Sequence, residues 1–355
     1  MSANEKRLGG SKTVTSTDVD HDRRPLRFLP VKRAPTAGPV APLLQCPPWF
    51  SGDHDPIDGR SVTIAHTFSA GAAISRVTDT VSAMPESGRE PLGALRALHG
   101  RYGLAMLLAH ELHGPSRAPR VVLVHGITES RHSWDPLIPA LAERFRLLTV
   151  DLRGHGESPK GPDYTPMSYA ADVIETAASV GWERPHMVGH SLGGVVVSAA
   201  AAMGGTSRVV NVDQPLNLGA LKEQLATLEP MLRSDAATFR SALDAVFVSL
   251  DGPLPAAQRA RIRQYGQPDQ QVVLGTWQLM LESSLESLNA TVDTLSEAVK
   301  VPYLSLHGID PGPEYAPWLR ARIPQAVVEV WPGLGHYPQL IEPERFVERV
   351  VQFLD

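Results

Sequence analysis

Short apolar runs alternate with stretches of helical spacing over residues 121–213 and again from residue 301 to 355, and this alternation restricts the possible folds more than any other feature. Strands that are apolar along their whole length are buried on both faces, which is typical of a parallel sheet covered by helices. The sequence therefore predicts an α/β fold with a mostly parallel central sheet. The expected strands cover residues 121–126, 146–151, 186–189, 208–213, 301–308 and 326–331.

Helical spacing fills the segments between these runs. Residues 133–145 favour a helix with Ser133 as its N-cap, and a helix over 169–181 is expected to stop at Gly181. Another helix is expected over 195–203, and an amphipathic one starts near Pro343. Before the first strand, two apolar stretches around a glycine-bearing turn predict a hairpin over 95–114.

The alternation stops between about residues 214 and 300. Three stretches there have the composition of consecutive helices, at 220–233, 237–250 and 272–288. An insertion between two sheet strands lies above the strand ends, so this segment is predicted to form a helical cap on the domain.

Residues 1–90 differ from the rest of the chain. They begin polar and charged, become rich in proline between Pro25 and Pro56, and keep no periodic apolar stripe. Such a segment buries too little surface to offset its ordering entropy, so we expect a disordered or loosely docked extension before a domain at 91–355. A single helix or strand over 62–84 that docks on the domain is the alternative.

Composition excludes several classes of partner. The chain of 355 residues is 43% hydrophobic and 20% charged with a net charge of −5, which points to neither nucleic acid nor a membrane surface as partner. Cys46 is its only cysteine, so no intrachain disulfide can form. With no apolar leader at the N-terminus, these features predict a cytoplasmic protein.

A serine flanked by glycines follows the expected strand at 186–189. The segment Gly189-His190-Ser191-Leu192-Gly193 matches the pattern G-x-S-x-G between a strand and a helix. A tight turn of this kind needs small neighbours, and it lifts the serine hydroxyl above the sheet at a helix N-terminus. The pattern predicts that Ser191 is a nucleophile.

With this motif, the chain resembles the α/β-hydrolase superfamily in its single-chain esterase, lactonase and haloperoxidase-like branch. The resemblance covers about residues 92–355 and implies the α/β-hydrolase fold. It also implies a catalytic triad in the chain order serine, acid, histidine. The segments that carry the resemblance are VVLVHGITES at 121–130, VDLRGHGES at 150–158, VGHSLGG at 188–194, LSLHGID at 304–310 and GLGHYPQLIEPERF at 333–346.

The resemblance assigns the general base and leaves two candidates for the acid. His336 follows the last expected strand, at the family position of the base. Asp310 follows the strand at 301–308 and is the favoured acid, although family members often carry it one residue later, where this chain has Pro311. Asp213 ends the strand at 208–213, which some relatives use instead.

An oxyanion hole and a substrate pocket follow from the same resemblance. The backbone amides of Ile127 and Leu192 are the expected oxyanion donors. Large apolar side chains could line a substrate pocket, although packing in the protein core accounts for each of them equally well. These pocket candidates are Trp134, Phe247, Trp277 and Met280.

Two further clusters contain residue types that can bind ligands. His110 and His113 are spaced like metal ligands, but no third and fourth ligand is evident, so no metal site is predicted. Arg259, Arg261 and Arg263 form a basic run. The run is interpreted as a solvated helix face, with binding of a substrate carboxylate as the alternative.

Together these features predict a serine hydrolase that needs no cofactor and cleaves an ester, thioester or lactone through an acyl-enzyme. Its partner would be a small-molecule acyl substrate, and the oligomeric state is left open. Three alternatives share the fold: a hydrolase of carbon–carbon bonds, a perhydrolase, and a ligand-binding receptor with a vestigial triad.

Overall fold

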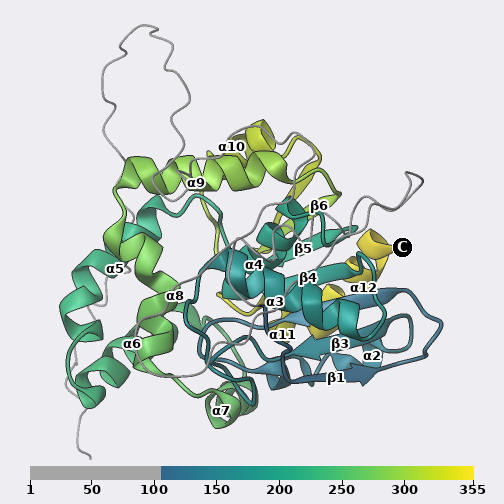
Figure 1. Ribbon diagram of the computed structural model, residues 1–355, viewed down its shortest axis with the longest axis horizontal. Coiled ribbons are helices and arrows are strands. Elements are labelled where there is room, and N and C mark those ends of the chain that lie inside the picture. Colours follow the sequence, from purple (N-terminus) through teal and green to yellow (C-terminus); the bar gives the residue numbers. More distant parts are fainter. Residues whose placement is uncertain (1–104) are drawn as a thin grey trace, which may run out of the picture. The chain divides into compact units, whose positions relative to one another are not determined.

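The structure is a computed structural model that describes residues 105–355. The extension predicted over 1–90 and the first half of the predicted hairpin lie outside these residues. The described chain forms one seven-stranded sheet in the order β1-β3-β2-β4-β5-β6-β7 (Figure 1). Only β1 runs antiparallel to its neighbour. The strands are β1 (His110–His113), β2 (Arg120–Val124), β3 (Arg146–Val150), β4 (His186–His190), β5 (Val209–Val212), β6 (Tyr303–His307) and β7 (Ala326–Val330).

Helices cover both faces of this sheet, so its central strands are buried on both sides, whereas the edge strands β1 and β7 are partly exposed. Alternate residues of β2 show the pattern, because Val122 and Val124 belong to one apolar core while Val121 and Leu123 belong to the other. The first core contains side chains of α3, α4 and α10, and the second those of α2 and α12. The predicted α/β class with a mostly parallel sheet is confirmed. The helices are α2 (Ile138–Leu141), α3 (Pro166–Ser179), α4 (Leu192–Ala202), α10 (Tyr315–Arg322) and α12 (Pro343–Leu354).

Five helices stand between β5 and β6, where the sequence indicated three. The arginine-rich α7 buries no residue, so it has no apolar stripe to predict it from. The stretch predicted as one helix over 272–288 is two, because Ser284 caps a new helix by accepting a hydrogen bond from the amide of Ser287. The five are α5 (Gly219–Leu232), α6 (Ala236–Leu250), α7 (Ala256–Tyr265), α8 (Gln270–Glu282) and α9 (Leu285–Ala298).

Two local predictions before β4 differ from the structure. The helix expected over 133–145 is a 3-10 turn, η2 (Arg131–Trp134), followed by the short α2. Pro136 and Pro139 interrupt the stretch because proline has no amide hydrogen to donate, and Ser133 lies inside η2 instead of capping a helix. Of the hairpin predicted over 95–114, the structure describes the second half. This half contains β1, which pairs with β3.

Candidate active site

Ser191 occupies a strained turn between β4 and α4. Its backbone has φ 54° and ψ −121°, a conformation that side chains other than glycine rarely adopt. The flanking glycines allow the turn to close. A Cβ on Gly189 would lie 2.1 Å from the carbonyl oxygen of Gly193, and one on Gly193 would lie 2.2 Å from that of Val124. The turn therefore requires the G-x-S-x-G spacing and places Ser191 at the N-terminus of an 11-residue helix.

His336 is held by three contacts from separate elements. Its Nδ1 lies 2.6 Å from Oδ2 of Asp213, the residue that follows β5. Its backbone amide donates to the carbonyl of Leu250 at the end of α6 (2.8 Å), and its own carbonyl faces Nε2 of His190 (2.8 Å). Because Asp213 is an acceptor, Nδ1 carries the proton and the Nε2 lone pair of His336 is left available.

Asp213 is a buried carboxylate with a complete set of donors. Its Oδ1 accepts hydrogen bonds from the amides of Gly308 (2.7 Å) and Ile309 (3.0 Å), while Oδ2 faces His336. Burial is the largest influence on its pKa and raises it. The hydrogen bonds from His336 and the Ile309 amide, with attraction to His336 when its ring is protonated, outweigh burial, so the pKa lies below its ordinary value. Asp213 is therefore ionised at neutral pH.

Asp310 does not face His336, so the favoured sequence assignment of the acid does not hold in the structure. Asp310 is exposed, and its Oδ1 accepts the amide of Gly312 (2.8 Å) in a local turn. The loop after β6 serves the alternative candidate instead, because its first two amides, those of Gly308 and Ile309, bind the Asp213 carboxylate.

A second buried charge pair adjoins the serine. His190 Nδ1 lies 3.5 Å from Glu129 Oε1, and both side chains are at most 3% exposed. Nε2 of His190 faces the carbonyl of His336, whereas Nδ1 makes no hydrogen bond within residues 105–355 and lies at ion-pair distance from the Glu129 carboxylate, which favours the protonated ring. Glu129 also accepts hydrogen bonds from the Tyr337 hydroxyl (3.2 Å) and the Gly126 amide (3.4 Å). Glu129 was not among the predicted site residues, because its one signal in the sequence is a carboxylate soon after a buried strand.

The pKa values of this pair shift in the directions that favour both charges. Burial is the largest influence on each group and opposes its charge. The attraction of the protonated His190 nevertheless lowers the pKa of Glu129 from 4.5 to about 2. The charge of Glu129 in turn raises the pKa of His190 above 6.5. The two shifts are mutual, because the charged form of each residue stabilises the charged form of the other.

We expect Glu129→Gln to destabilise the fold by about 3 kcal/mol, because it leaves the His190 cation buried without a counter-charge. The lowered pKa of Glu129 gives stability that is present above pH 4.5 and lost as pH falls towards 2. The raised pKa of His190 gives stability that is present below pH 6.5 and lost as pH rises through its folded value. Urea unfolding of both proteins should therefore show the largest difference between pH 4.5 and 6.5. A difference independent of pH would contradict the ion pair.

Two backbone amides near Ser191 are free to bind an anion. Among residues 105–355, the amides of Ile127 and Leu192 donate no hydrogen bond. Gly126 allows the loop that carries the Ile127 amide to approach Ser191 closely, because a Cβ on Gly126 would lie 3.2 Å from Cβ of Ser191. No hydrogen bond joins Ser191 to His336 within this part of the chain. Such bonds are often long without substrate and tighten when it binds.

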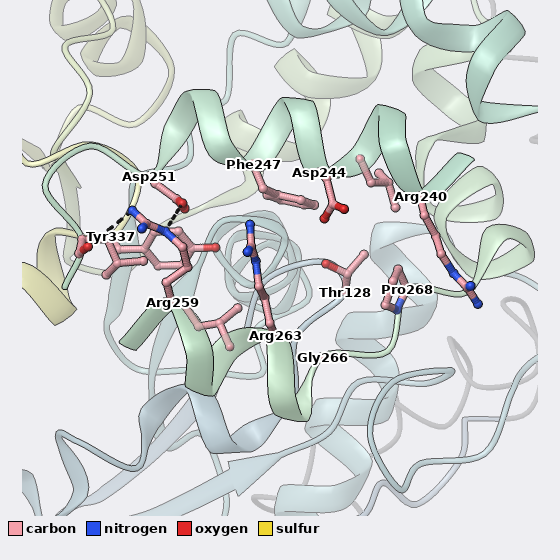
Figure 2. A pocket seen from close by; sticks show the side chains of 13 residues that line it. Thr128, Arg240, Asp244, Phe247, Asp251, Arg259, Arg263, Gly266, Pro268 and Tyr337 are labelled. Carbon is pink, nitrogen blue, oxygen red and sulfur yellow. Dashed lines mark hydrogen bonds and ion pairs between the residues drawn. The ribbon is translucent and has the colours of Figure 1, made fainter. Parts of the chain in front are cut away.

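A cavity of about 270 Å³ opens beside these groups. Its lining includes Thr128 and Tyr337, the neighbours in sequence of Ile127 and His336 (Figure 2). Ser191 itself does not line it. The helices α6 and α7 of the insertion supply most of its walls, so the insertion determines what can approach the site from this side.

Only Phe247 of the four predicted pocket residues lines this cavity. Trp134 is 1% exposed and packs in the core on the face of the sheet covered by α2 and α12. Trp277 is 7% exposed in the opposite core, and Met280 packs against that core. An apolar side chain in a helix serves a core and a pocket equally well, so the sequence did not separate the two roles.

Residues 105–355 contain neither a membrane-spanning helix nor a cluster of metal ligands. No helix in that range is long and apolar enough to cross a membrane. In the same range no three side chains of His, Cys, Asp or Glu are grouped so that they could hold a metal ion.

Comparison with known proteins identifies the family. The sequence model of the alpha/beta hydrolase family matches residues 121–349, so the chain belongs to this family, as the motifs predicted. The chain is 27% identical to an uncharacterized protein of Mycobacterium tuberculosis over 277 residues, 69% of this chain and 80% of that one. It is 27% identical to the sn-1-specific diacylglycerol lipase ABHD11 of Mus musculus over 261 residues, 68% of this chain and 83% of the lipase. The crystal structure of the esterase RhEst1 from Rhodococcus sp. ECU1013 matches with a TM-score of 0.54 and 25% identity, over 70% of this chain and 96% of the esterase.

Proposed function

We propose that the protein is a serine hydrolase that cleaves a carboxylic ester, thioester or lactone through an acyl-enzyme. Ser191 is the nucleophile, His336 the general base and Asp213 the acid that orients it. The observation that carries the proposal is the hydrogen bond between His336 Nδ1 and Asp213, on a loop next to the strained Ser191 turn. Similarity to a lipase and an esterase supports the same reaction class.

In the first half of the reaction, Ser191 Oγ attacks the substrate carbonyl carbon while His336 Nε2 takes the hydroxyl proton. The tetrahedral intermediate collapses, and His336 gives the proton to the leaving alcohol or thiol. In the second half, His336 takes a proton from water as the water attacks the acyl-enzyme, and the proton returns to Ser191 Oγ. The net change is one ester and one water converted to one acid and one alcohol. Asp213 stays ionised and stabilises the imidazolium that forms twice.

The free amides of Ile127 and Leu192 would bind the oxyanion of each tetrahedral intermediate. Leu192 opens α4, so the helix dipole adds to the stabilisation of negative charge there. One such donor contributes about 3 kcal/mol to transition-state stabilisation in other serine hydrolases. The helical insertion would act as a cap that covers this reaction centre.

Labelling with a fluorophosphonate tests the proposal, because an activated serine attacks its phosphorus and is phosphonylated. We expect mass spectrometry to find one label, on the peptide that contains Ser191. A panel of esters, thioesters and lactones should then show steady turnover. A single acylation without turnover would favour a ligand-binding receptor. Release of acid only from diketones would favour the carbon–carbon hydrolase, and formation of a peracid from the ester and peroxide would favour the perhydrolase. An unlabelled Ser191 in folded protein would refute the proposal.

A further inference from the structure

The cavity between α6 and α7 lies on one side of the proposed reaction centre. Its wall on α6 is joined to the site directly, because the carbonyl of Leu250 at the end of α6 accepts the backbone amide of His336. The opposite wall is α7, whose C-cap Gly266 packs on Thr128: a Cβ there would lie 2.6 Å from the Thr128 carbonyl oxygen. A substrate that reaches Ser191 from this side therefore contacts both helices.

The lining of the cavity combines apolar and cationic groups. Apolar side chains come from both helices and the loop between them. Three arginines and two aspartates complete the charged part of the lining, so one positive charge is in excess. The apolar members are Leu243, Phe247, Leu254 and Ile262, and the charged members are Arg240, Asp244, Asp251, Arg259 and Arg263.

Two arginines of the basic run on α7 form ion pairs with carboxylates of the protein. Arg259 Nε lies 2.6 Å from Oδ2 of Asp251, which neutralises both groups at the inner end of the cavity. Arg261 Nη1 lies 3.2 Å from Oδ2 of Asp135, and Arg261 does not line the cavity.

Arg263 is the member of the run that keeps its charge for a ligand. It has no ion pair or hydrogen bond to any of residues 105–355. Figure 2 shows its side chain rising from α7 across the cavity towards Phe247 and Asp244 on α6, with the guanidinium at the tip. Arg240 extends away from the Arg263 guanidinium, towards the right of the view. A guanidinium beside an apolar ring suits an anion at the end of a hydrocarbon chain.

We propose that Arg263 binds a carboxylate on the acyl part of the substrate, so that the enzyme prefers esters, thioesters or lactones of acids that carry a second carboxylate. The apolar side chains of α6 and α7 hold the carbon chain between the two ends. Asp244 lines the same cavity and repels an anion, so it limits the affinity. The inference rests on the proposed function for its reaction and on Arg263 for its specificity.

The test compares monoethyl adipate with its neutral isostere, in which the free carboxylate is a primary amide. We expect kcat/KM, measured by release of ethanol, to be at least about tenfold higher for the acid than for the amide. Arg263→Gln should lower this ratio of acid to amide by about tenfold. Salt should reduce the ratio in the wild type, because Arg263 is exposed and its charge is screened. Monoethyl esters of shorter and longer dicarboxylic acids would identify the chain length that spans from Ser191 to Arg263.

Arg261→Gln is the matched control, since it removes the same charge from the same helix outside the cavity. It should keep the wild-type ratio of acid to amide. A wild type with no preference, or an Arg263→Gln variant that keeps it, would overturn the inference while leaving ester hydrolysis intact.

A binding measurement separates this inference from the proposed function. Calorimetric titration of monoethyl adipate into Ser191→Ala should give an affinity that falls about tenfold when Arg263→Gln is added. Binding that depends on Arg263, together with no turnover of any ester by the wild type, would keep the anion site and reject the hydrolase. Binding that is indifferent to Arg263 would reject the anion site.

Discussion

Asp213→Asn is expected to lower kcat by about ten-thousandfold while the protein stays folded. The amides of Gly308 and Ile309 both donate to Oδ1 of Asp213, so the asparagine oxygen must occupy that place. The new NH2 group then faces Nδ1 of His336 in the position of Oδ2. Two donors cannot share one hydrogen bond, and His336 adopts the tautomer with its proton on Nε2. In that tautomer it has no lone pair for the hydroxyl proton of Ser191.

Asp310→Asn is the matched control for this prediction. Its side-chain oxygen still accepts the Gly312 amide after the substitution, and the residue is exposed, so kcat should change less than about twofold. The measurement is kcat on one ester for the three proteins, with circular dichroism to confirm folding. If Asp310→Asn is the crippling variant, a different conformation of the loop after β6 operates in catalysis and the proposed triad is wrong.

The choice between Asp213 and Asp310 as the acid could not be made from the sequence alone. Both follow apolar strands, and strand pattern alone shows that each lies at the same edge of a parallel sheet. The choice depends on which carboxylate the loop amides bind and which one turns outward. Those are tertiary contacts between residues about 95 positions apart, and no local pattern encodes them.

The same limit explains the other outcomes. Strands and the G-x-S-x-G turn were predictable because burial on both faces and lack of space beside Ser191 restrict the residue types directly. The cavity was not, because its walls depend on how α6 and α7 meet. Helix α7 has no buried residue, so hydrophobic spacing could not predict it. Its basic run was visible in the sequence, but only the ion pairs of Arg259 and Arg261 show that Arg263 differs from them.

Ser191→Ala is expected to have the largest effect on catalysis, a loss of about a millionfold in kcat together with loss of the fluorophosphonate label. The residual activity of this variant would come from the amides of Ile127 and Leu192, which still stabilise an oxyanion when water attacks the substrate. Substrate binding should survive, because the cavity between α6 and α7 does not include the Ser191 hydroxyl. KM would then approach the dissociation constant measured by calorimetry.

Ser191→Gly separates the chemistry of the hydroxyl from the strain of the turn. Glycine adopts φ 54° without a steric penalty, whereas alanine keeps the Cβ that opposes it. Both variants lack the proposed nucleophile and should be equally inactive, yet the glycine variant should be more stable than the alanine variant by about 1 kcal/mol in urea unfolding. Equal inactivity with unequal stability would show that the chain accepts backbone strain at Ser191 in order to present the hydroxyl to the substrate. Turnover near the wild-type rate in either folded variant would remove Ser191 from the mechanism.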